Sequence, residues 1–499
     1  MAKPVLSLGA WRHLSGVEGG RVLGLPAEHL VTHGVVVGMT GSGKTGLVTV
    51  LVEEAARARV PTVVIDVKGD LPNLLLAFPG FRAEALLPWI EGDSEGVSAE
   101  EAMARAHELA ERRRAALGEW GIGEAELASY VQGTQVRVLT PGSSAGEALH
   151  MLSSLERRSS RWDSDPEAAR DALTAAVSLV LRLLGREPDP AKSREHVLLS
   201  VLAERRLAAG LNAELGALMQ DVLTPPIAEI GALSMDAFMK KTERRSLAAA
   251  LNTLLASPSL ASWRQGANLD VAEWLAPKQG KTPIVVVSVA HLDDEERALV
   301  LGVLLEEVLS WVRTLSGSQR LRALVVFDEV YGFLPPHPAN PPTKRPLVAL
   351  MKQARGFGVG VVVATQNPMD LDYRALSNAG LWFLGRLQTD ADRARVVEGL
   401  AAARGNEDGG GAELETTLQR LAPRWFVVRN AHVQSPPILM QPRFAMTLMR
   451  GPMTRTEIRR ARGYETTNWR AMGYDGARHE QTDLDPGGTE RSRQDDIRS

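Results

Sequence analysis

The sequence predicts an α/β fold with a mainly parallel sheet and a large inserted α-helical subdomain. Its apolar segments are short and continuous, which is typical of strands buried on both faces of a parallel sheet. Helical patterns fall between most of these segments, and this alternation is typical of a doubly wound core. A long, mostly helical stretch separates the second strand from the third, so we expect the inserted subdomain there. The predicted strands are Gly34–Gly38, Pro61–Val67, Pro283–Ala290, Ala323–Asp328, Val359–Thr365, Leu381–Leu387 and Trp425–Asn430.

A glycine-rich loop directly follows the first predicted strand. It reads GMTGSGKT from Gly38 to Thr45 and fits the phosphate-binding pattern G-x-x-x-x-G-K-[ST] at every defined position. The N–H groups of such a loop, with the N-terminus of the next helix, surround the phosphates of a nucleotide. We expect Lys44 to reach the β- and γ-phosphates of ATP and the Thr45 hydroxyl to hold Mg²⁺. A glycine-rich turn that matches by chance is the alternative, and the helical pattern from Gly46 to Arg59 argues against it. The predicted nucleotide-binding residues are Gly38, Thr40, Gly41, Ser42, Gly43, Lys44, Thr45 and Gly46.

Two acids, Asp328 and Glu329, stand at the end of the fourth predicted strand. This places them at the carboxyl edge of the sheet, where the phosphate loop also opens and where ligands of open α/β sheets bind. We predict that Asp328 holds the water shell of Mg²⁺ and that Glu329 polarises the water that attacks the γ-phosphate. An acidic strand end before a polar turn is the alternative for an isolated pair, and the upstream phosphate loop favours the catalytic interpretation.

Polar residues end other strands at the same edge. Gln366 is placed to orient the attacking water or to sense the γ-phosphate, the alternative being a glutamine bonded to backbone. Asp66 either assists Mg²⁺ or caps the following turn. Arg386, Arg393 and Arg395 are candidates for an arginine delivered to the γ-phosphate of a neighbouring subunit. Arginines on a solvated helix face are the alternative for all three.

A stiff basic loop covers residues 333–345. Five prolines restrict it, and it ends in two cations, Lys344 and Arg345. Such a loop near the acidic pair suits contact with a DNA phosphate backbone in a central channel. An ordinary proline-rich connection is the alternative. The basic runs at residues 112–114 and 240–245 are weaker candidates, because most such runs are solvated helix faces.

The composition limits the classes of site and partner. The chain has 499 residues, 44% of them hydrophobic and 23% charged, which suffices for two or three globular domains. The formal net charge is −3, so any DNA contact must come from a local basic surface. The absence of cysteine excludes disulfides, thiolate metal sites and cysteine nucleophiles. We find no signal-peptide pattern and no run of 18 apolar residues, and therefore expect a cytoplasmic protein. The acids after His291 fit a helix start better than a metal site.

The chain divides into four predicted parts. Residues 1–78 form the first part of a P-loop ATPase core, 79–281 an inserted mainly helical subdomain, 282–462 the second part of the core, and 463–499 a disordered polar tail. The insert is inferred because the acidic pair begins 283 residues after Thr45. One strand-like piece, residues 135–139, lies within the insert, and residues 408–411 are expected to form a flexible loop. The predicted helices of the inserted subdomain are Glu100–Leu117, Pro166–Leu184, Arg194–Ala209 and Glu243–Ser257.

Together these motifs resemble the HerA/FtsK superfamily of P-loop DNA-translocating ATPases, on the HerA-like side. The resemblance covers Val31–Leu75 and Thr282–Arg450. It implies a RecA-like P-loop NTPase core and a homohexameric ring that binds ATP between subunits and pumps double-stranded DNA through its pore. The segments that carry it are His33-Gly34 with GMTGSGKT, Ile65–Asp70, Asp328-Glu329, Ala364–Pro368 and Leu384–Leu387.

The resemblance also implies site residues, cofactors and partners. The cofactors are ATP and Mg²⁺, and relatives often work with a nuclease or another effector. Only 37 residues precede Gly38, so we do not expect the N-terminal β-barrel of HerA proteins. We also expect neither the transmembrane helices nor the winged-helix DNA reader of FtsK proteins. The residues that match the family motifs are Lys44, Thr45, Asp328, Glu329 and Gln366, with Arg386 in the place of the trans-acting arginine.

Two other functions fit the same motifs. One is a related motor that acts on protein, like the soluble ATPases of type IV secretion. The other is a scaffold that nucleotide binding switches. ATPase turnover that rises with duplex DNA in a salt-dependent way distinguishes the DNA motor from both.

Overall fold

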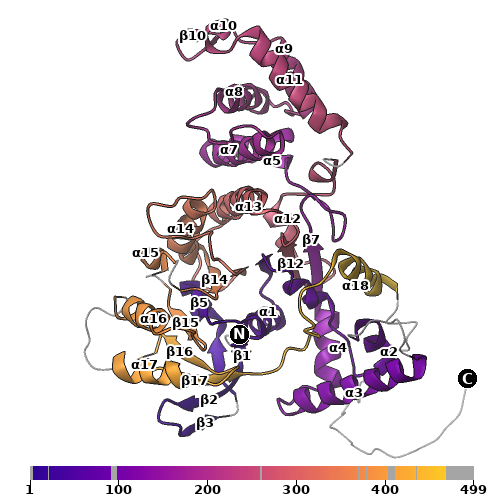
Figure 1. The fold of residues 1–499 in the computed structure, drawn as a ribbon, viewed down its shortest axis with the longest axis vertical. Coiled ribbons are helices and arrows are strands. Elements are labelled where there is room, and N and C mark those ends of the chain that lie inside the picture. The colour runs from indigo at the N-terminus through magenta and orange to yellow at the C-terminus, as the bar shows by residue number, and fades with distance from the viewer. Residues whose placement is uncertain are drawn as a thin grey trace, which may run out of the picture.

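A large sheet forms the centre of the molecule (Figure 1). The computed structural model describes residues 4–20, 22–90, 98–258, 261–368, 371–376, 379–402, 411–433 and 435–467. The sheet has eleven strands in the order β3-β2-β17-β16-β15-β5-β14-β13-β6-β12-β7. In that order the strands are Glu18–Gly20, Gly9–His13, Ile438–Pro442, Phe426–Asn430, Leu381–Leu384, Gly34–Val37, Val359–Thr365, Ala323–Asp328, Thr62–Asp66, Thr282–Ser288 and Thr134–Leu139.

Most of this sheet is parallel. Every neighbouring pair from β15 to β7 is parallel, and the strands on the other side of β15 are antiparallel. All seven strands predicted from the sequence are present, and six of them belong to the parallel part. These findings confirm the predicted α/β class with a mainly parallel sheet. Two strands before the phosphate loop, β1 (Val5–Ser7) and β4 (Gly24–Pro26), pair with each other outside it.

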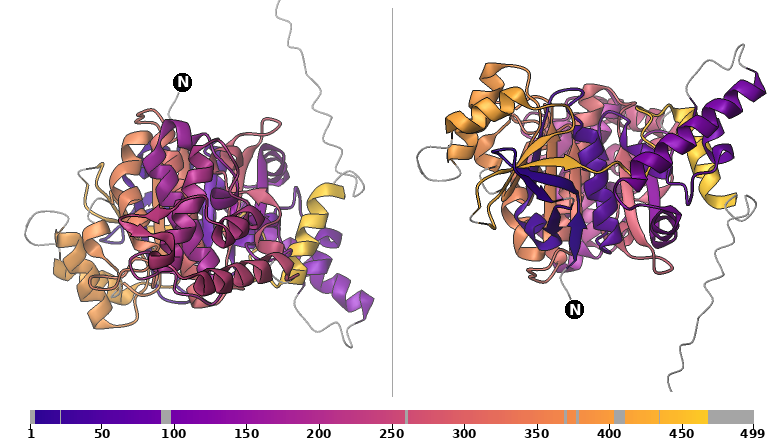
Figure 2. Two further views of the ribbon diagram at one scale, coloured as in Figure 1. Left: turned by 90° about the horizontal axis from the view of Figure 1, so that it is seen from above. Right: turned by 90° about the horizontal axis from the view of Figure 1, so that it is seen from below.

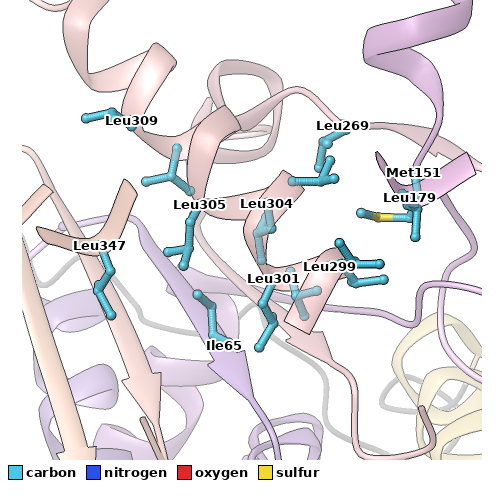
Figure 3. Close-up of a cluster of buried hydrophobic side chains, with 14 of the residues drawn as sticks. Ile65, Met151, Leu179, Leu269, Leu299, Leu301, Leu304, Leu305, Leu309 and Leu347 are labelled. Carbon is cyan, nitrogen blue, oxygen red and sulfur yellow. The ribbon is translucent and has the colours of Figure 1, made fainter. Parts of the chain in front are cut away.

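Helices cover both faces of the sheet because consecutive strand residues point to opposite sides. Val36 of β5 belongs to a buried cluster that includes α1 (Lys44–Arg57), whereas Val35 belongs to the cluster on the other face. On that other face, α13 (Asp294–Thr314) and α14 (Lys344–Gln353) lie against the strands. Figure 3 shows Ile65 of β6 beside leucines of α13, all of them buried. The core is therefore a three-layer arrangement with the sheet in the middle.

The chain between β6 and β12 is mostly helical. Its middle helices extend away from the sheet along the long axis of the molecule, and α13 lies between α7 and the sheet (Figure 1). Strand β7 of the same segment is an edge strand of the core sheet, where it pairs with β12. The segment therefore contributes a strand to the core, and its division from the core at residues 79 and 281 stays a prediction. Its helices are α2 (Ala83–Leu86), α3 (Ala99–Gly118), α4 (Glu124–Gly133), α5 (Ser153–Glu156), α6 (Arg161–Ser164), α7 (Pro166–Leu183), α8 (Arg194–Ala208), α9 (Leu215–Leu223), α10 (Met235–Phe238), α11 (Lys241–Ala256) and α12 (Val271–Leu275).

The remaining described helices lie at the two sides of the sheet. Figure 2 shows α16 (Asp390–Ala402) and α17 (Gly411–Arg420) on one side, with α3 and α18 (Arg455–Thr467) on the other. The predicted tail from residue 463 begins inside α18, and residues 468–499 lie outside the described residues, as do 408–410 of the predicted loop. The short elements left are α15 (Tyr373–Leu376), β8 (Leu149–His150), β9 (Glu229–Ile230), β10 (Leu233–Ser234) and β11 (Ala267–Asn268). None of the described helices is long and apolar enough to cross a membrane.

Candidate nucleotide site

The strands that carry the predicted motifs end in register at one edge of the sheet. Thr365 of β14 pairs with Val37 of β5, and Asp328 of β13 pairs with Asp66 of β6. Since β14 lies between β5 and β13, the loop after β5 and the acids after β13 are about 10 Å apart at the backbone. Long side chains are needed to close that gap.

The loop after β5 has the backbone that a phosphate-binding loop requires. Gly41 and Gly43 have φ angles of 78° and 91°, which favour glycine, and α1 begins immediately afterwards at Lys44. A Cβ on Gly38 would stand 2.5 Å from the Ser42 Oγ, so this position also excludes a side chain. The Ser42 Oγ is buried and has no hydrogen-bond partner among the described residues. A buried hydroxyl without a partner is costly, and a bound phosphate oxygen would satisfy it.

Lys44 joins the loop to the two distant acids. Its Nζ lies 2.7 Å from the Asp328 Oδ1 and 3.7 Å from the Glu329 Oε2. The side chains of Lys44 and Asp328 are 3% and 1% exposed, so the pair is desolvated. The second carboxylate oxygen of Asp328 is buried without a hydrogen-bond partner in the described part of the chain. The predicted convergence of the phosphate loop and the acidic pair is present in the structure.

Glu329 is held in a defined position at the same place. Its backbone has a φ of 61°, an unusual value for a residue with a side chain. Its Oε1 accepts hydrogen bonds from the Gln366 N–H (3.1 Å) and the Thr365 hydroxyl (3.2 Å), and its Oε2 lies 2.6 Å from the Lys68 Nζ. Burial alone would raise the pKa of Glu329, but Lys44 and Lys68 lower that pKa below its ordinary value. Glu329 is therefore an ionised carboxylate at neutral pH, as a base that orients water must be.

Gln366 lies between the loop and Glu329. Its Oε1 accepts a hydrogen bond of 2.9 Å from the Thr40 hydroxyl, and its backbone N–H binds Glu329. The side chain is half-buried, so it reaches the loop and retains contact with solvent. The structure thus links the ends of β5, β13 and β14 through these two hydrogen bonds of Gln366.

Asp66 is fully buried and bonded within the protein. Its Oδ1 accepts from the Gly69 N–H (2.9 Å) and its Oδ2 from the Ser288 hydroxyl (2.7 Å). Burial, together with the charge of Asp328, raises the pKa of Asp66 to about 7. These contacts support the capping role, the second of the two roles that the sequence left open.

The three candidate arginines differ in their freedom. Arg386 is exposed, and its carbonyl accepts a hydrogen bond of 2.9 Å from the Met39 N–H, which places it beside the phosphate loop. Arg393 is buried, pairs with Asp390 and donates to the Leu387 carbonyl. Arg395 is partly buried. Of the three, Arg386 is the one whose exposure and position suit contact with a second subunit.

Two residues of the site were not predicted. Lys68 lies two residues after the end of β6, and its position near a strand end was a signal in the sequence for the contact with Glu329. Arg424 is far from every motif, yet its N–H donates to the Ser42 carbonyl (2.9 Å) and its Cγ is 3.0 Å from where a Cβ of Gly43 would stand. No local pattern around Arg424 indicates that contact.

The predicted DNA contacts are neutralised within the chain. The Lys344 Nζ donates to the Ala339 carbonyl (3.1 Å) and lies 3.4 Å from the Asp372 Oδ2. Arg345 pairs with Asp171 of α7 at 2.8 Å. The stiff loop therefore offers less free positive charge than its sequence indicates.

Comparison with known families agrees with this geometry. Residues 23–98, which include the phosphate loop, α1 and β6, match the family model described as the central domain of helicase HerA. This segment is HerA-like. The match confirms the resemblance to the HerA/FtsK superfamily over these residues. Among proteins of curated function, none matches the chain by sequence.

Solved structures of low similarity accompany this match. VirB4 of Thermoanaerobacter pseudethanolicus is 12% identical with a TM-score of 0.49, over 88% of this chain and 96% of that one. The plasmid coupling protein TrwB in complex with ADP and Mg²⁺ is 14% identical with a TM-score of 0.46, over 91% and 92% of the two chains.

Proposed function

We propose that the chain hydrolyses ATP at the site formed by residues 38–45, Asp328 and Glu329. The observation that carries the proposal is the 2.7 Å contact between the Lys44 Nζ and the Asp328 Oδ1, with Glu329 adjacent. The loop supplies backbone donors for phosphates, and the acids supply the groups that a metal-assisted hydrolysis needs.

The residues present fit a triphosphate with Mg²⁺. The Ser42 Oγ and the Asp328 Oδ2 are buried polar atoms that lack partners among the described residues, and they flank Lys44. Thr45 and Asp328 would hold the metal, Asp328 through water, and Asp66 would assist only by its proximity to Asp328. Bound Mg²⁺ would neutralise charge on the phosphates.

Each side chain then has a defined task. Lys44 holds the β- and γ-phosphates, and Thr40 and Gln366 close the loop side of the site through their mutual hydrogen bond. Glu329 accepts a proton from the attacking water, because Lys68 and Lys44 keep it ionised. Its two bonds from Gln366 and Thr365 fix the direction of its carboxylate.

We further propose that the chain acts as a ring-shaped motor on double-stranded DNA, as a homohexamer. Exposed Arg386 beside the phosphate loop suits a trans-acting role toward a neighbour's ATP. The HerA-like segment supports the motor class, since the matched family is named for a helicase. A nuclease or another effector would be the partner that the motor serves.

The test is ATP turnover as a function of duplex DNA concentration at two salt concentrations. We expect DNA to raise turnover several-fold at low salt and less at high salt, because phosphate contacts are screened. Turnover that stays flat over all DNA concentrations at low salt would refute the DNA motor and leave the protein-translocating or scaffold function. Absence of any ATP turnover would refute the ATPase itself.

A further inference from the structure

A basic surface occupies the edge of the sheet opposite the nucleotide site. Two segments lead to it: residues 313–322, which connect α13 to β13, and residues 344–358, in which α14 runs from the side of the nucleotide site toward this edge and continues into β14. They contain no acid, although the chain as a whole carries a net charge of −3. Their seven cations are Arg313, Arg320, Arg322, Lys344, Arg345, Lys352 and Arg355.

Five of these cations keep their positive charge free, and we call them the basic platform: Arg313, Arg320, Arg322, Lys352 and Arg355. All five are exposed, and none forms an ion pair within the described part of the chain. The guanidinium of Arg313 donates to the Gln353 Oε1, and that of Arg322 to Ser316. Bonds to such neutral groups orient the cations without cancelling their charge.

Backbone hydrogen bonds join the two segments into one surface. The Ser318 N–H donates to the Gly356 carbonyl (3.0 Å), and the Arg322 N–H donates to the Gly358 carbonyl (2.7 Å). Gly358 has a φ of 74°, and a Cβ there would stand 2.2 Å from the Arg320 carbonyl oxygen. Only glycine permits this close approach. The backbone that carries the platform is thus fixed before any ligand binds, which reduces the entropy cost of binding.

A cavity of about 1000 Å³ adjoins the platform. Lys352 and Arg355 line it together with Ser318, Gln319, His29 and His432. Glu28 is the one acid among the described residues that line it. The cationic, hydroxyl and amide side chains around this cavity are groups that donate hydrogen bonds to phosphate oxygens.

We propose that the basic platform binds the phosphate backbone of duplex DNA. This inference rests on the proposed motor function and gives the DNA a different contact surface from the proline-rich loop, where Lys344 and Arg345 are neutralised by Asp372 and Asp171. The seven residues of β14 separate the platform from the phosphate loop by roughly 20 Å. DNA phosphates on the platform therefore do not compete with the phosphates of ATP.

The experiment compares the full chain with a platform variant in which Arg320, Lys352 and Arg355 are all replaced by alanine. Binding of a fluorescent DNA duplex is followed by anisotropy across a range of KCl concentrations. Loss of three phosphate contacts should reduce the magnitude of the negative slope of log K against log salt by about 2–3 and weaken binding roughly tenfold or more at low salt. A variant that replaces Arg320 and Arg355 by lysine should retain most of the binding, because the charge remains.

A matched control replaces three exposed cations that form no ion pair among the described residues, Arg105, Arg205 and Arg459, by alanine. It should bind DNA like the unmodified chain, and both alanine variants should keep the ATP turnover measured without DNA. An unmodified chain that binds no DNA would overturn the motor function and the platform together. A platform variant that binds with unchanged affinity and slope would overturn the platform alone. A platform variant that changes the oligomer size in sedimentation would also overturn it, because the cations would then form a subunit contact.

Discussion

The buried contact between Lys44 and Asp328 predicts a large energetic coupling between residues 284 positions apart. At 2.7 Å, two unit charges attract by roughly 6 kcal/mol at an effective dielectric constant of about 20. Desolvation of both groups offsets much of this attraction. Removing one partner of such a pair nevertheless costs about 3–5 kcal/mol, because a buried charge is left without compensation.

The assay is a double-mutant cycle in urea unfolding, without nucleotide. It uses Lys44→Met, Asp328→Asn and the double variant, since both substitutions preserve side-chain volume. We expect a coupling free energy of about 3 kcal/mol. Lys44→Met should cost more than Asp328→Asn, because it also uncovers Glu329, which lies 3.7 Å from the Lys44 Nζ.

The control is the cycle for Arg182 and Glu295, which lie 2.8 Å apart with side chains 30% and 75% exposed. That pair should couple by less than about 1 kcal/mol, since solvent screens it. A coupling between Lys44 and Asp328 as small as that of the control would refute the buried contact, and with it the argument that the loop and the acids share one site.

Three further predictions concern single residues. Glu329→Gln should bind ATP and lower turnover by roughly 10²–10⁴, measured as phosphate release; undiminished release would contradict its role as the base. The free energy of unfolding of Asp66→Asn, relative to that of the unmodified chain, should increase by roughly 2–3 kcal/mol from pH 5 to pH 8, as measured by denaturant unfolding. The reason is that folding raises the pKa of Asp66 from 3.8 to about 7, so the unmodified chain loses stability as the pH rises from 3.8 to 7, whereas the variant has no such group; a pH-independent difference would contradict the raised pKa. Gly43→Ala should weaken ATP binding at least tenfold in a titration, because of the φ of 91° and the contact with Arg424, whereas Gly118→Ala on α3 should bind normally; equal affinities would show that the loop tolerates the side chain.

The parallel core could be predicted from the sequence because its information is local. A continuous apolar run such as Val35–Val37 buries both faces of a strand, and GSGKT directly after it specifies a loop and a helix start. Because parallel strands have their carboxyl ends at one edge of the sheet, Asp328 and Glu329 were expected close to Lys44. Strand ends meet at this edge however far apart the motifs lie in the chain.

Other features depend on contacts between distant segments. Strands β2 and β17 extend the sheet by pairing with each other, and β2 has a partly exposed pattern that the chain alone does not distinguish from a loop. The charges of Lys344 and Arg345 are a second example. The sequence indicates that both are free, but in the fold Asp372 and Asp171 lie beside them. Strand-end chemistry was thus predictable, and the partners of surface charges were not.

The most direct test of the central claim is a structure of the full chain determined with a non-hydrolysable ATP analogue and Mg²⁺. We predict a triphosphate between the loop of residues 38–45 and the acids Asp328 and Glu329, with the Lys44 Nζ on a phosphate oxygen. A nucleotide bound elsewhere, with the contact between Lys44 and Asp328 undisturbed at 2.7 Å, would contradict the account.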